Sequence, residues 1–211
     1  MVTQWLASRG GDFGDAKVIS LQLGAGCSIT ASRGGAPVDT SMGFTPLEGL
    51  VMATRAGDVD AGLLFYLQRE AGIDAAQLET LLQKESGLLG LSGVSGDMRV
   101  LLAADKSAAK SAIALYCYRA KKYIGAYLAV LGGADAVLFG GGVGENSPEI
   151  RARILAGMGW CGLKLDTAAN QAPKLQGGRI STANSKIEIA VIRVDEAHIM
   201  AQAAADLLRG K

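Results

Sequence analysis

The stretch ADAVLFGGGVGENSPE, residues 134–149, decides the fold class. Its first six residues, apolar apart from one aspartate, are typical of a buried strand. Glycines dominate residues 140–144, and the Ser-Pro-Glu that follows is typical of a helix start, because proline fits the first helical position. A buried strand followed by a glycine-rich turn and a helix indicates an α/β fold, in which ligands bind near the ends of the strands.

Further strands and helices are predicted on both sides of this unit. Residues 17–23 (KVISLQL) and 27–32 are interpreted as the strands of a hairpin around Gly24-Ala25-Gly26, and residues 186–194 as the final strand. A helix is predicted at residues 45–54 because a Thr cap, a first-position Pro and a Glu three residues after the cap agree. The other predicted helices lie at residues 2–8, 63–70, 74–85, about 105 to 131, from 147, and 195–208.

The composition bounds the class of protein. The 211 residues are 49% apolar and 19% charged, which suits a sizeable core and excludes a disordered chain. The 21 basic and 20 acidic residues give a net charge of +1, which disfavours nucleic acid and anionic membranes as partners. Charged side chains interrupt the most apolar stretch, residues 113–143, and no signal peptide is recognised. Three scattered cysteines are typical of reduced thiols, so a cytoplasmic location is expected.

Glycine is the unusual component, at 29 of 211 residues, about twice the average share. It clusters in three turns, residues 24–26, 93–99 and 140–146. Glycine lets backbone N–H groups approach phosphate oxygens; one such turn is usually only a turn, but three in one chain favour a nucleotide site. Neither a Walker P-loop nor a Rossmann fingerprint is present. The single histidine, His198, has no Gly-x-Ser-x-Gly elbow to work with, which disfavours hydrolase chemistry.

Two charged residues are further candidates, each with an ordinary structural alternative. Arg55 could stabilise a phosphoryl group during transfer, or could pair on the surface with Asp58 or Asp60. Glu196 could bind Mg²⁺, which prefers oxygen ligands, or could be an acidic residue favoured by a helix N-terminus. Spacing alone leaves both alternatives open.

Long blocks of sequence resemble the acetate kinase family. They occur in the family's order and cover almost the whole chain from about residue 17. The blocks are VDTSMGFTPLEG (38–49), TRAGDVD (54–60), KESGLLG (84–90), RAKKYIGA (119–126) and GGVGENSP (141–148).

The resemblance implies the acetate/sugar kinase–Hsp70–actin fold, which is ribonuclease H-like, with a mixed central sheet flanked by helices. It implies reversible phosphoryl transfer between ATP and acetate, giving acetyl phosphate and ADP, with Mg²⁺ as cofactor. It also implies a homodimer formed through this part of the chain. Residues 17–211 are therefore expected to be a nucleotide-binding and dimerisation domain, and residues 1–16 the tail of a preceding element or a linker.

The same resemblance implies roles for individual residues. Arg55 is expected to be the transition-state arginine, and Glu196 the carboxylate associated with Mg²⁺. The other expected site residues form three groups around the nucleotide: the phosphate-binding hairpin turn of Gln22, Leu23, Gly24, Ala25 and Gly26; the nucleotide border of Asp97, Met98 and Arg99; and the adenosine side of Gly141, Gly142, Val143, Gly144, Glu145 and Asn146.

The chain departs from the family pattern in two respects. The family's phosphate hairpin reads His-Leu-Gly-Asn-Gly, whereas Gln22 and Ala25 stand here in place of the imidazole and the amide. The chain also resembles only the C-terminal half of an acetate kinase, and the N-terminal half carries the family's catalytic aspartate, acetate-binding arginine, second Mg²⁺ ligand and transition-state histidine. Three interpretations follow. The chain is the C-terminal portion of an acetate kinase, either a fragment of a complete enzyme or a chain that needs a separate N-terminal partner; or it is a non-catalytic nucleotide-binding or dimerisation module; or it is a relative of propionate or butyrate kinases.

Overall fold

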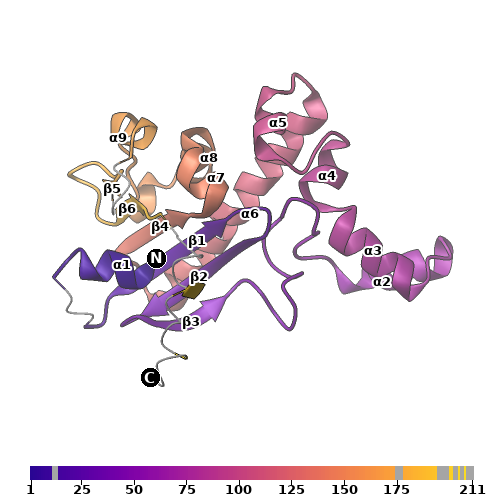
Figure 1. Ribbon diagram of the computed structural model, residues 1–211, viewed down its shortest axis with the longest axis horizontal. Helices are drawn as coiled ribbons and strands as arrows, with labels where there is room; N and C mark the ends of the chain where they lie inside the picture. Colours follow the sequence, from indigo (N-terminus) through magenta and orange to yellow (C-terminus); the bar gives the residue numbers. More distant parts are fainter. Residues whose placement is uncertain (11–13, 174–177, 194–199, 202–203, 205–206, 208–211) are drawn as a thin grey trace.

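A mixed sheet forms the centre of the computed structural model (Figure 1). The structure describes residues 1–10, 14–173, 178–193, 200, 201, 204 and 207. The strands, in their order across the sheet, are β3 (Ala36–Thr40), β2 (Cys27–Arg33), β1 (Lys17–Leu23), β4 (Ala136–Gly140), β6 (Glu188–Val191) and β5 (Gly178–Arg179). The β1–β4 and β4–β6 pairs are parallel, and the other pairs are antiparallel. The predicted mixed sheet and its β1–β2 hairpin are thus confirmed.

Helices flank this sheet along most of the chain. In chain order they are α1 (Val2–Ala7), α2 (Ala61–Glu70), α3 (Ala75–Lys84), α4 (Gly87–Ser92), α5 (Met98–Ala103), α6 (Ser107–Leu131), α7 (Gly141–Asn146), α8 (Pro148–Leu155), the 3-10 turn η1 (Gly159–Cys161) and α9 (Thr167–Gln171). The predicted helices at the positions of α1, α2, α3, α6 and α8 are confirmed. The helices α5 and α9, the turn η1 and the strands β3 and β5 were not predicted.

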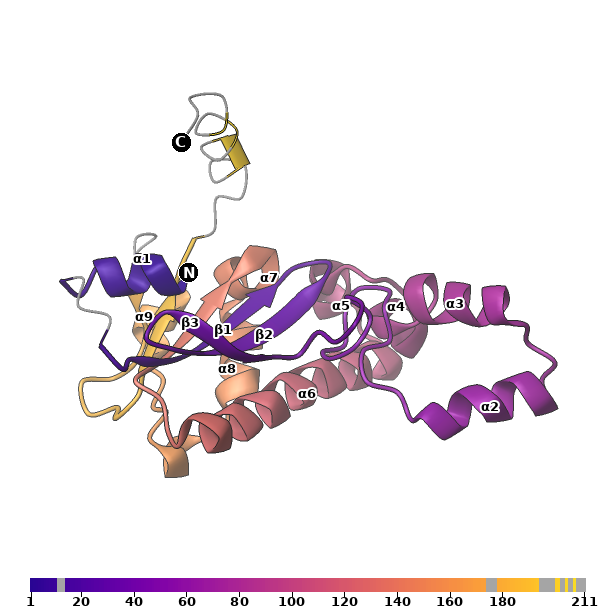
Figure 2. The same cartoon turned by 90° about the horizontal axis from the view of Figure 1, so that it is seen from below.

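Both faces of the sheet are apolar, because successive residues of a strand point to opposite sides. On one face, Ile19 and Leu21 of β1 join the main core, to which α6 and α8 contribute. On the other, Val18 packs with Trp5 and Leu6 of α1 in a smaller cluster. Figure 2 shows α1 and α6 on opposite sides of the sheet. The central strands are therefore covered by helices on both faces.

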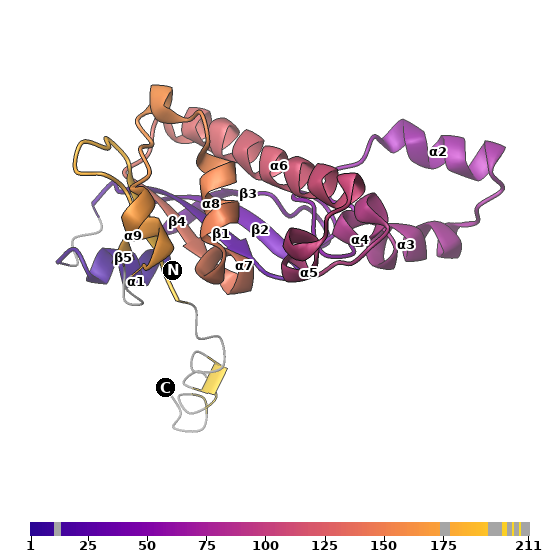
Figure 3. The same cartoon turned by 90° about the horizontal axis from the view of Figure 1, so that it is seen from above.

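The helices α2 and α3 form an arm that extends beyond the end of the sheet (Figure 3). Each helix begins at a side-chain cap: Asp60 accepts a hydrogen bond from Gly62 N, and Asp74 forms a capping box with Gln77. No residue of α2 is buried. Local capping signals, rather than burial in the core, thus define the ends of these helices.

The helix predicted at residues 45–54 is wrong, since residues 41–60 contain neither helix nor strand. Gly49 has a φ of +107°, which a helix does not accept. The backbone bonds with distant partners instead: Ala53 N donates to Ala25 O at 3.0 Å, and Asp58 N donates to Gly49 O at 3.0 Å. The Thr-Pro-x-Glu signal is local, and these tertiary contacts outweigh it.

The structure also differs from the predictions at two glycine-rich segments. Residues 140–146, predicted as a turn, contain the short helix α7, and the glycine-rich residues 87–92, for which no helix was predicted, form α4. Glycine is a poor helix former, so the sequence favours turns there, and packing against the core overrides that preference. The predicted turn at residues 93–99 is present in its first part. Gly93 ends α4 with a left-handed φ of +60°, four residues before Asp97 caps α5.

The last predicted elements are described only in part. The strand β6 is confirmed within the predicted range 186–194. Of the helix predicted at 195–208, residues 200, 201, 204 and 207 are described, and all four are helical. Glu196 and His198 lie outside the described residues.

The helix α7 lies directly against the end of β1 at Gly141. This residue has a φ of +75°, and a Cβ there would lie 2.7 Å from Leu23 O and 2.9 Å from Leu23 N. Both the left-handed backbone and the short separation favour glycine. Gly141 therefore sets how closely α7 approaches the hairpin turn that follows β1.

Replacing Gly141 with alanine is expected to lower the free energy of unfolding by about 2 kcal/mol or more, because left-handed strain of about 1–2 kcal/mol adds to the clash with Leu23. The matched variant Gly142→Ala places its Cβ in open space in the same helix. It is expected to stay within about 1 kcal/mol of the unchanged chain. Urea unfolding followed by circular dichroism measures both, and equal stabilities for the two variants would contradict the expectation.

Candidate functional site

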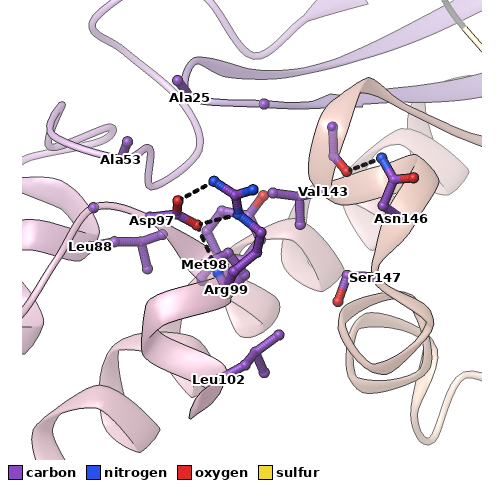
Figure 4. A pocket seen from close by; sticks show the side chains of 14 residues that line it. Ala25, Ala53, Leu88, Asp97, Met98, Arg99, Leu102, Val143, Asn146 and Ser147 are labelled. Carbon is purple, nitrogen blue, oxygen red and sulfur yellow. Dashed lines mark hydrogen bonds and ion pairs between the residues drawn. The ribbon is translucent and has the colours of Figure 1, made fainter. Parts of the chain in front are cut away.

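A cavity of about 640 Å³ lies where the glycine-rich segments meet (Figure 4). The hairpin turn after β1, the start of α5 and the helix α7 form most of its wall, and Ala53, Leu88 and Tyr116 add to it. A cavity of this size suits a small-molecule ligand or cofactor. Eight of the expected nucleotide-binding residues line it: Gly24, Ala25, Asp97, Met98, Arg99, Gly142, Val143 and Asn146. The expected residues that do not line it are Gln22, Leu23, Gly26, Gly141, Gly144 and Glu145.

The parallel pairing of β1 with β4 places the first and last of these segments side by side. Gln22 lies opposite Gly140 in the register of the two strands. Because parallel strands end at the same edge, the turn after β1 and the helix α7 after β4 emerge together. This edge, beyond the carboxyl ends of the strands, is where open α/β sheets bind their ligands.

An ion pair between Asp97 and Arg99 borders the cavity at the start of α5. The Asp97 carboxylate accepts hydrogen bonds from Arg99 N at 2.8 Å, Nε at 3.1 Å and Nη2 at 2.6 Å. The hydrogen bonds from Arg99 lower the pKa of Asp97 to about 2, and the same pairing raises the pKa of Arg99. Figure 4 shows this pair across the cavity from Val143 and Asn146. The carboxylate thus caps α5 and holds the guanidinium beside the cavity.

Polar groups within α7 hold the opposite wall. Asn146 Nδ2 donates to Gly142 O at 2.9 Å, and Glu145 Oε1 accepts from Gly141 N at 3.1 Å. The amide of Asn146 is therefore held in a defined orientation where it borders the cavity.

A fully buried arginine of α8 forms hydrogen bonds with the C-terminal end of α7. Arg151 has no exposed surface, and it donates to Gly144 O, Glu145 O and both oxygens of Asn170 at 2.6–2.9 Å. Burial lowers its pKa to about 10, so the group stays charged at neutral pH. Carbonyl groups near the C-terminal end of a helix have no N–H partner within the helix. Arg151 donates the hydrogen bonds that two such carbonyls of α7 need. Sequence reasoning missed this residue, although its spacing of three from Ile154 places it on the apolar face of α8.

Arg55 lies beside the hairpin turn and does not line the cavity. Its Nη1 donates to Pro46 O at 3.1 Å and lies 3.4 Å from the position of a Cβ at Gly26. The carboxylates suggested as surface partners are engaged elsewhere: Asp58 pairs with Arg119, and Asp60 caps α2. The guanidinium therefore sits next to the glycine turn.

No group of three or more His, Cys, Asp or Glu side chains with the geometry to hold a metal ion occurs in the part of the chain that the structure describes. Glu196, the expected Mg²⁺-associated carboxylate, is not in that part.

Gln22 lies close to α7, since its Oε1 is 3.1 Å from the position of a Cβ at Gly140. No helix among the described residues is long and apolar enough to cross a bilayer.

The fold and cavity define an α/β protein with a cavity at the carboxyl ends of parallel strands, where such folds bind their ligands. Residues 4–202 match the profile of the Acetokinase family, and the chain belongs to that family. The resemblance seen in the sequence blocks is thereby confirmed.

Individual relatives agree with the family assignment. An acetate kinase of Solibacter usitatus is 50% identical over 189 residues, which are 88% of this chain and 46% of the relative. The crystal structure of Porphyromonas gingivalis acetate kinase matches with a TM-score of 0.92 and 38% identity, covering 98% of this chain and 53% of that one. A propionate kinase from Francisella tularensis matches with a TM-score of 0.87 and 37% identity, covering 94% and 51%. The expected fold is confirmed, and the chain spans about half the length of these relatives.

The carboxyl group of Asp97 is expected to remain ionised down to about pH 3 in an NMR titration, because its pKa of about 2 lies below the usual value of about 3.9. The pair therefore adds stability above about pH 4, and this contribution is lost as the pH falls toward 2. The Arg99→Gln variant is expected to raise the midpoint toward the usual range, because it removes the side-chain hydrogen bonds of Arg99 and keeps the backbone ones. Arg153→Gln, which removes a separate surface pair with Glu149, should leave the midpoint unchanged. An unchanged chain in which Asp97 titrates near the usual value would contradict this.

Proposed function

We propose that this chain binds ATP and ADP in the cavity and supplies the nucleotide-binding half of an acetate kinase. The whole enzyme transfers a phosphoryl group reversibly from ATP to acetate, giving acetyl phosphate and ADP. The observation that carries the proposal is the convergence of three glycine-containing segments around one cavity, in a chain that is 50% identical to an acetate kinase over 189 residues. Residues 17–211 are proposed as the nucleotide-binding and dimerisation domain, and residues 1–16 as the tail of a preceding element.

The proposed roles follow from what each segment offers. The turn of Gly24, Ala25 and Gly26 offers backbone N–H groups to phosphate oxygens, since its glycines allow a close approach. Asp97, Met98 and Arg99 border the nucleotide, and residues 141–146 hold its adenosine side. Ser147 and Leu102 extend the same walls.

Arg55 is the proposed transition-state residue. Phosphoryl transfer depends mainly on positioning and on neutralising charge that spreads over the phosphoryl oxygens. A guanidinium beside Gly26 lies next to the proposed phosphate-binding turn. It is already oriented by its hydrogen bond to Pro46 O, so it needs little reorganisation to act.

Glu196 is the residue we propose to associate with Mg²⁺. Magnesium bound to a nucleotide takes most of its ligands from phosphate and water, so one or two protein carboxylates complete its coordination. The ion supplies positive charge to the phosphates when it is bound. The chain's own described residues contribute the turn, the cavity walls and Arg55.

The acceptor side of the proposed enzyme draws on the half of the relatives' length that this chain does not span. We propose that this half is a partner of the chain, whether in the same polypeptide or a separate one, and that acetate is bound mainly there. Propionate is a second candidate acceptor, because a propionate kinase matches the structure with a TM-score of 0.87. The three unpaired cysteines support a cytoplasmic location.

A homodimer is the proposed assembly, and the exposed surface of the α2–α3 arm supports it. Phe65 and Tyr66 of α2 are 63% and 55% exposed, and Phe44 in the preceding irregular segment is fully exposed. Exposed aromatic side chains on an unburied helix are typical of a surface that meets a partner.

The test is an assay of acetate-dependent ADP formation from Mg-ATP, with ADP binding measured by calorimetry. The chain alone is expected to bind ADP, to sediment as a dimer and to lack activity. Co-expression with the N-terminal half of a relative is expected to give activity, and Arg55→Ala should then lower turnover about a thousandfold or more. Arg153→Ala, an exposed arginine outside the cavity, serves as the control.

Absence of ADP binding by the chain would refute the nucleotide site. Activity of the chain alone that Arg55→Ala abolishes would show that the missing half is not needed. Replacing acetate by propionate in the same assay decides between the two acceptors.

Restoring the family's phosphate hairpin with Gln22→His and Ala25→Asn is expected to tighten Mg-ATP binding about three- to tenfold. The amide introduced at position 25 adds a donor worth about one hydrogen bond, and the imidazole at position 22 replaces the existing amide of Gln22. Ala25 lines the cavity, so an amide there can reach a bound phosphate. Ala36→Asn on the exposed edge strand β3 makes the same exchange away from the site. Unchanged affinity in the double variant would refute the importance of these two positions.

A further inference from the structure

A buried hydrogen-bond chain connects α6 to the hairpin turn. The hydroxyl of Tyr116 lies 3.3 Å from Cys27 Sγ, and Cys27 Sγ donates to Gly24 O at 3.3 Å. Tyr116 is only 3% exposed and Cys27 only 1%. The tyrosine also lines the cavity, so one side chain borders the cavity and contacts Cys27, which holds the hairpin turn.

The direction of each hydrogen bond in this chain follows from the chemistry of its groups. The carbonyl of Gly24 can only accept, so the thiol of Cys27 donates to it. The sulfur then accepts from the hydroxyl of Tyr116. Burial raises the pKa of Tyr116 well above its usual range and also raises the pKa of Cys27, so both groups keep their protons at neutral pH.

The carbonyl that this chain holds belongs to the peptide that joins Gly24 to Ala25. A trans peptide is planar, and its C=O and N–H point in opposite directions. When Gly24 O is held toward Cys27 and the core, Ala25 N–H is turned away from the core. Ala25 is exposed and lines the cavity, and no described residue accepts a hydrogen bond from its N–H.

We infer that Tyr116 is a positioning residue for the phosphate-binding turn: through Cys27, its hydroxyl orients the Gly24–Ala25 peptide so that Ala25 N–H faces the phosphates of a bound nucleotide. This inference rests on the proposed nucleotide function. The inference adds to that function the requirement that the Tyr116 hydroxyl contributes to binding of the phosphates and not to binding of the nucleoside.

The turn needs such support because its own sequence restrains it weakly. Gly24 and Gly26 are the most flexible residues a turn can contain, and Ala25 has no polar side chain. Within the turn itself, Gly24 N donates to Gly26 O at 3.1 Å, and from outside Ala53 N donates to Ala25 O at 3.0 Å. Neither bond holds the carbonyl of Gly24, which Cys27 holds.

The experiment compares the affinities of the chain for ADP and for adenosine by calorimetry. Tyr116→Phe removes only the hydroxyl and keeps the ring, so the fold and the cavity wall are retained. ADP affinity is expected to fall about three- to tenfold, the usual effect of one hydrogen bond, while adenosine affinity changes less than about twofold. A residue with a merely structural role would lower both affinities alike.

Matched variants separate the hydrogen-bond chain from packing. Tyr127→Phe makes the same change on α6 at a tyrosine that is equally buried at 3% exposure and does not line the cavity, and it should leave the ratio of the two affinities unchanged. Cys27→Ala should reproduce the effect of Tyr116→Phe, and the double variant should add no further loss, because both changes break one chain. Cys27→Ser keeps a donor and an acceptor and should retain ADP affinity.

Each result decides between the two proposals. If Tyr116→Phe leaves the ratio unchanged while the unchanged chain binds ADP, the positioning role is wrong and the nucleotide site stands. If the variant lowers both affinities equally, the role is structural and the inference is also wrong. If the unchanged chain does not bind ADP, the proposed function itself fails and the inference fails with it.

Discussion

The parallel pairing of β1 with β4 is the constraint on which the rest of the site depends. It places the ends of two buried strands at one edge of the sheet, with Gln22 opposite Gly140. The hairpin turn and α7 then emerge side by side, close enough that Gly141 leaves no room for a Cβ against Leu23. A shift of this register by one residue would displace α7 along the hairpin turn by about 3.3 Å and so disrupt the contact between the two cavity walls.

The walls of the cavity are held by groups that satisfy one another before any ligand binds. Asp97 and Arg99 pair at the start of α5, and Arg151 supplies the end of α7 with donors from the core. Preformed walls need little reorganisation on binding, which leaves more of the interaction energy for affinity. The irregular segment 41–60 is held similarly, through Asp58 and its contacts with Arg119 and Gly49.

Much of the fold could be predicted because its signals are local. The strands at β1, β2 and β4, the hairpin and the long helix α6 follow from apolar periodicity, and α2 and α3 follow from their caps. Residues 45–54 show the limit of such signals. Their Thr-Pro-x-Glu pattern is a valid helix start, but Gly49 has a left-handed backbone and Ala53 N donates to Ala25 O of the hairpin turn instead of to a helical partner. At α4 and α7 the error is the reverse: the glycine content disfavours a helix, but packing stabilises one in each segment.

The sequence by itself determined the family, the alternation of strands and helices, and the three glycine-rich segments of the site, because these reside in neighbouring residues. Only the tertiary structure decided which of those residues share a cavity. It placed Gly24, Asp97 and Asn146 on one cavity and Arg55 beside it, and it added Tyr116 and Arg151, which no motif marks. The reason is physical: local patterns set local conformation, whereas the meeting of distant segments is set by strand pairing and by the packing of buried side chains.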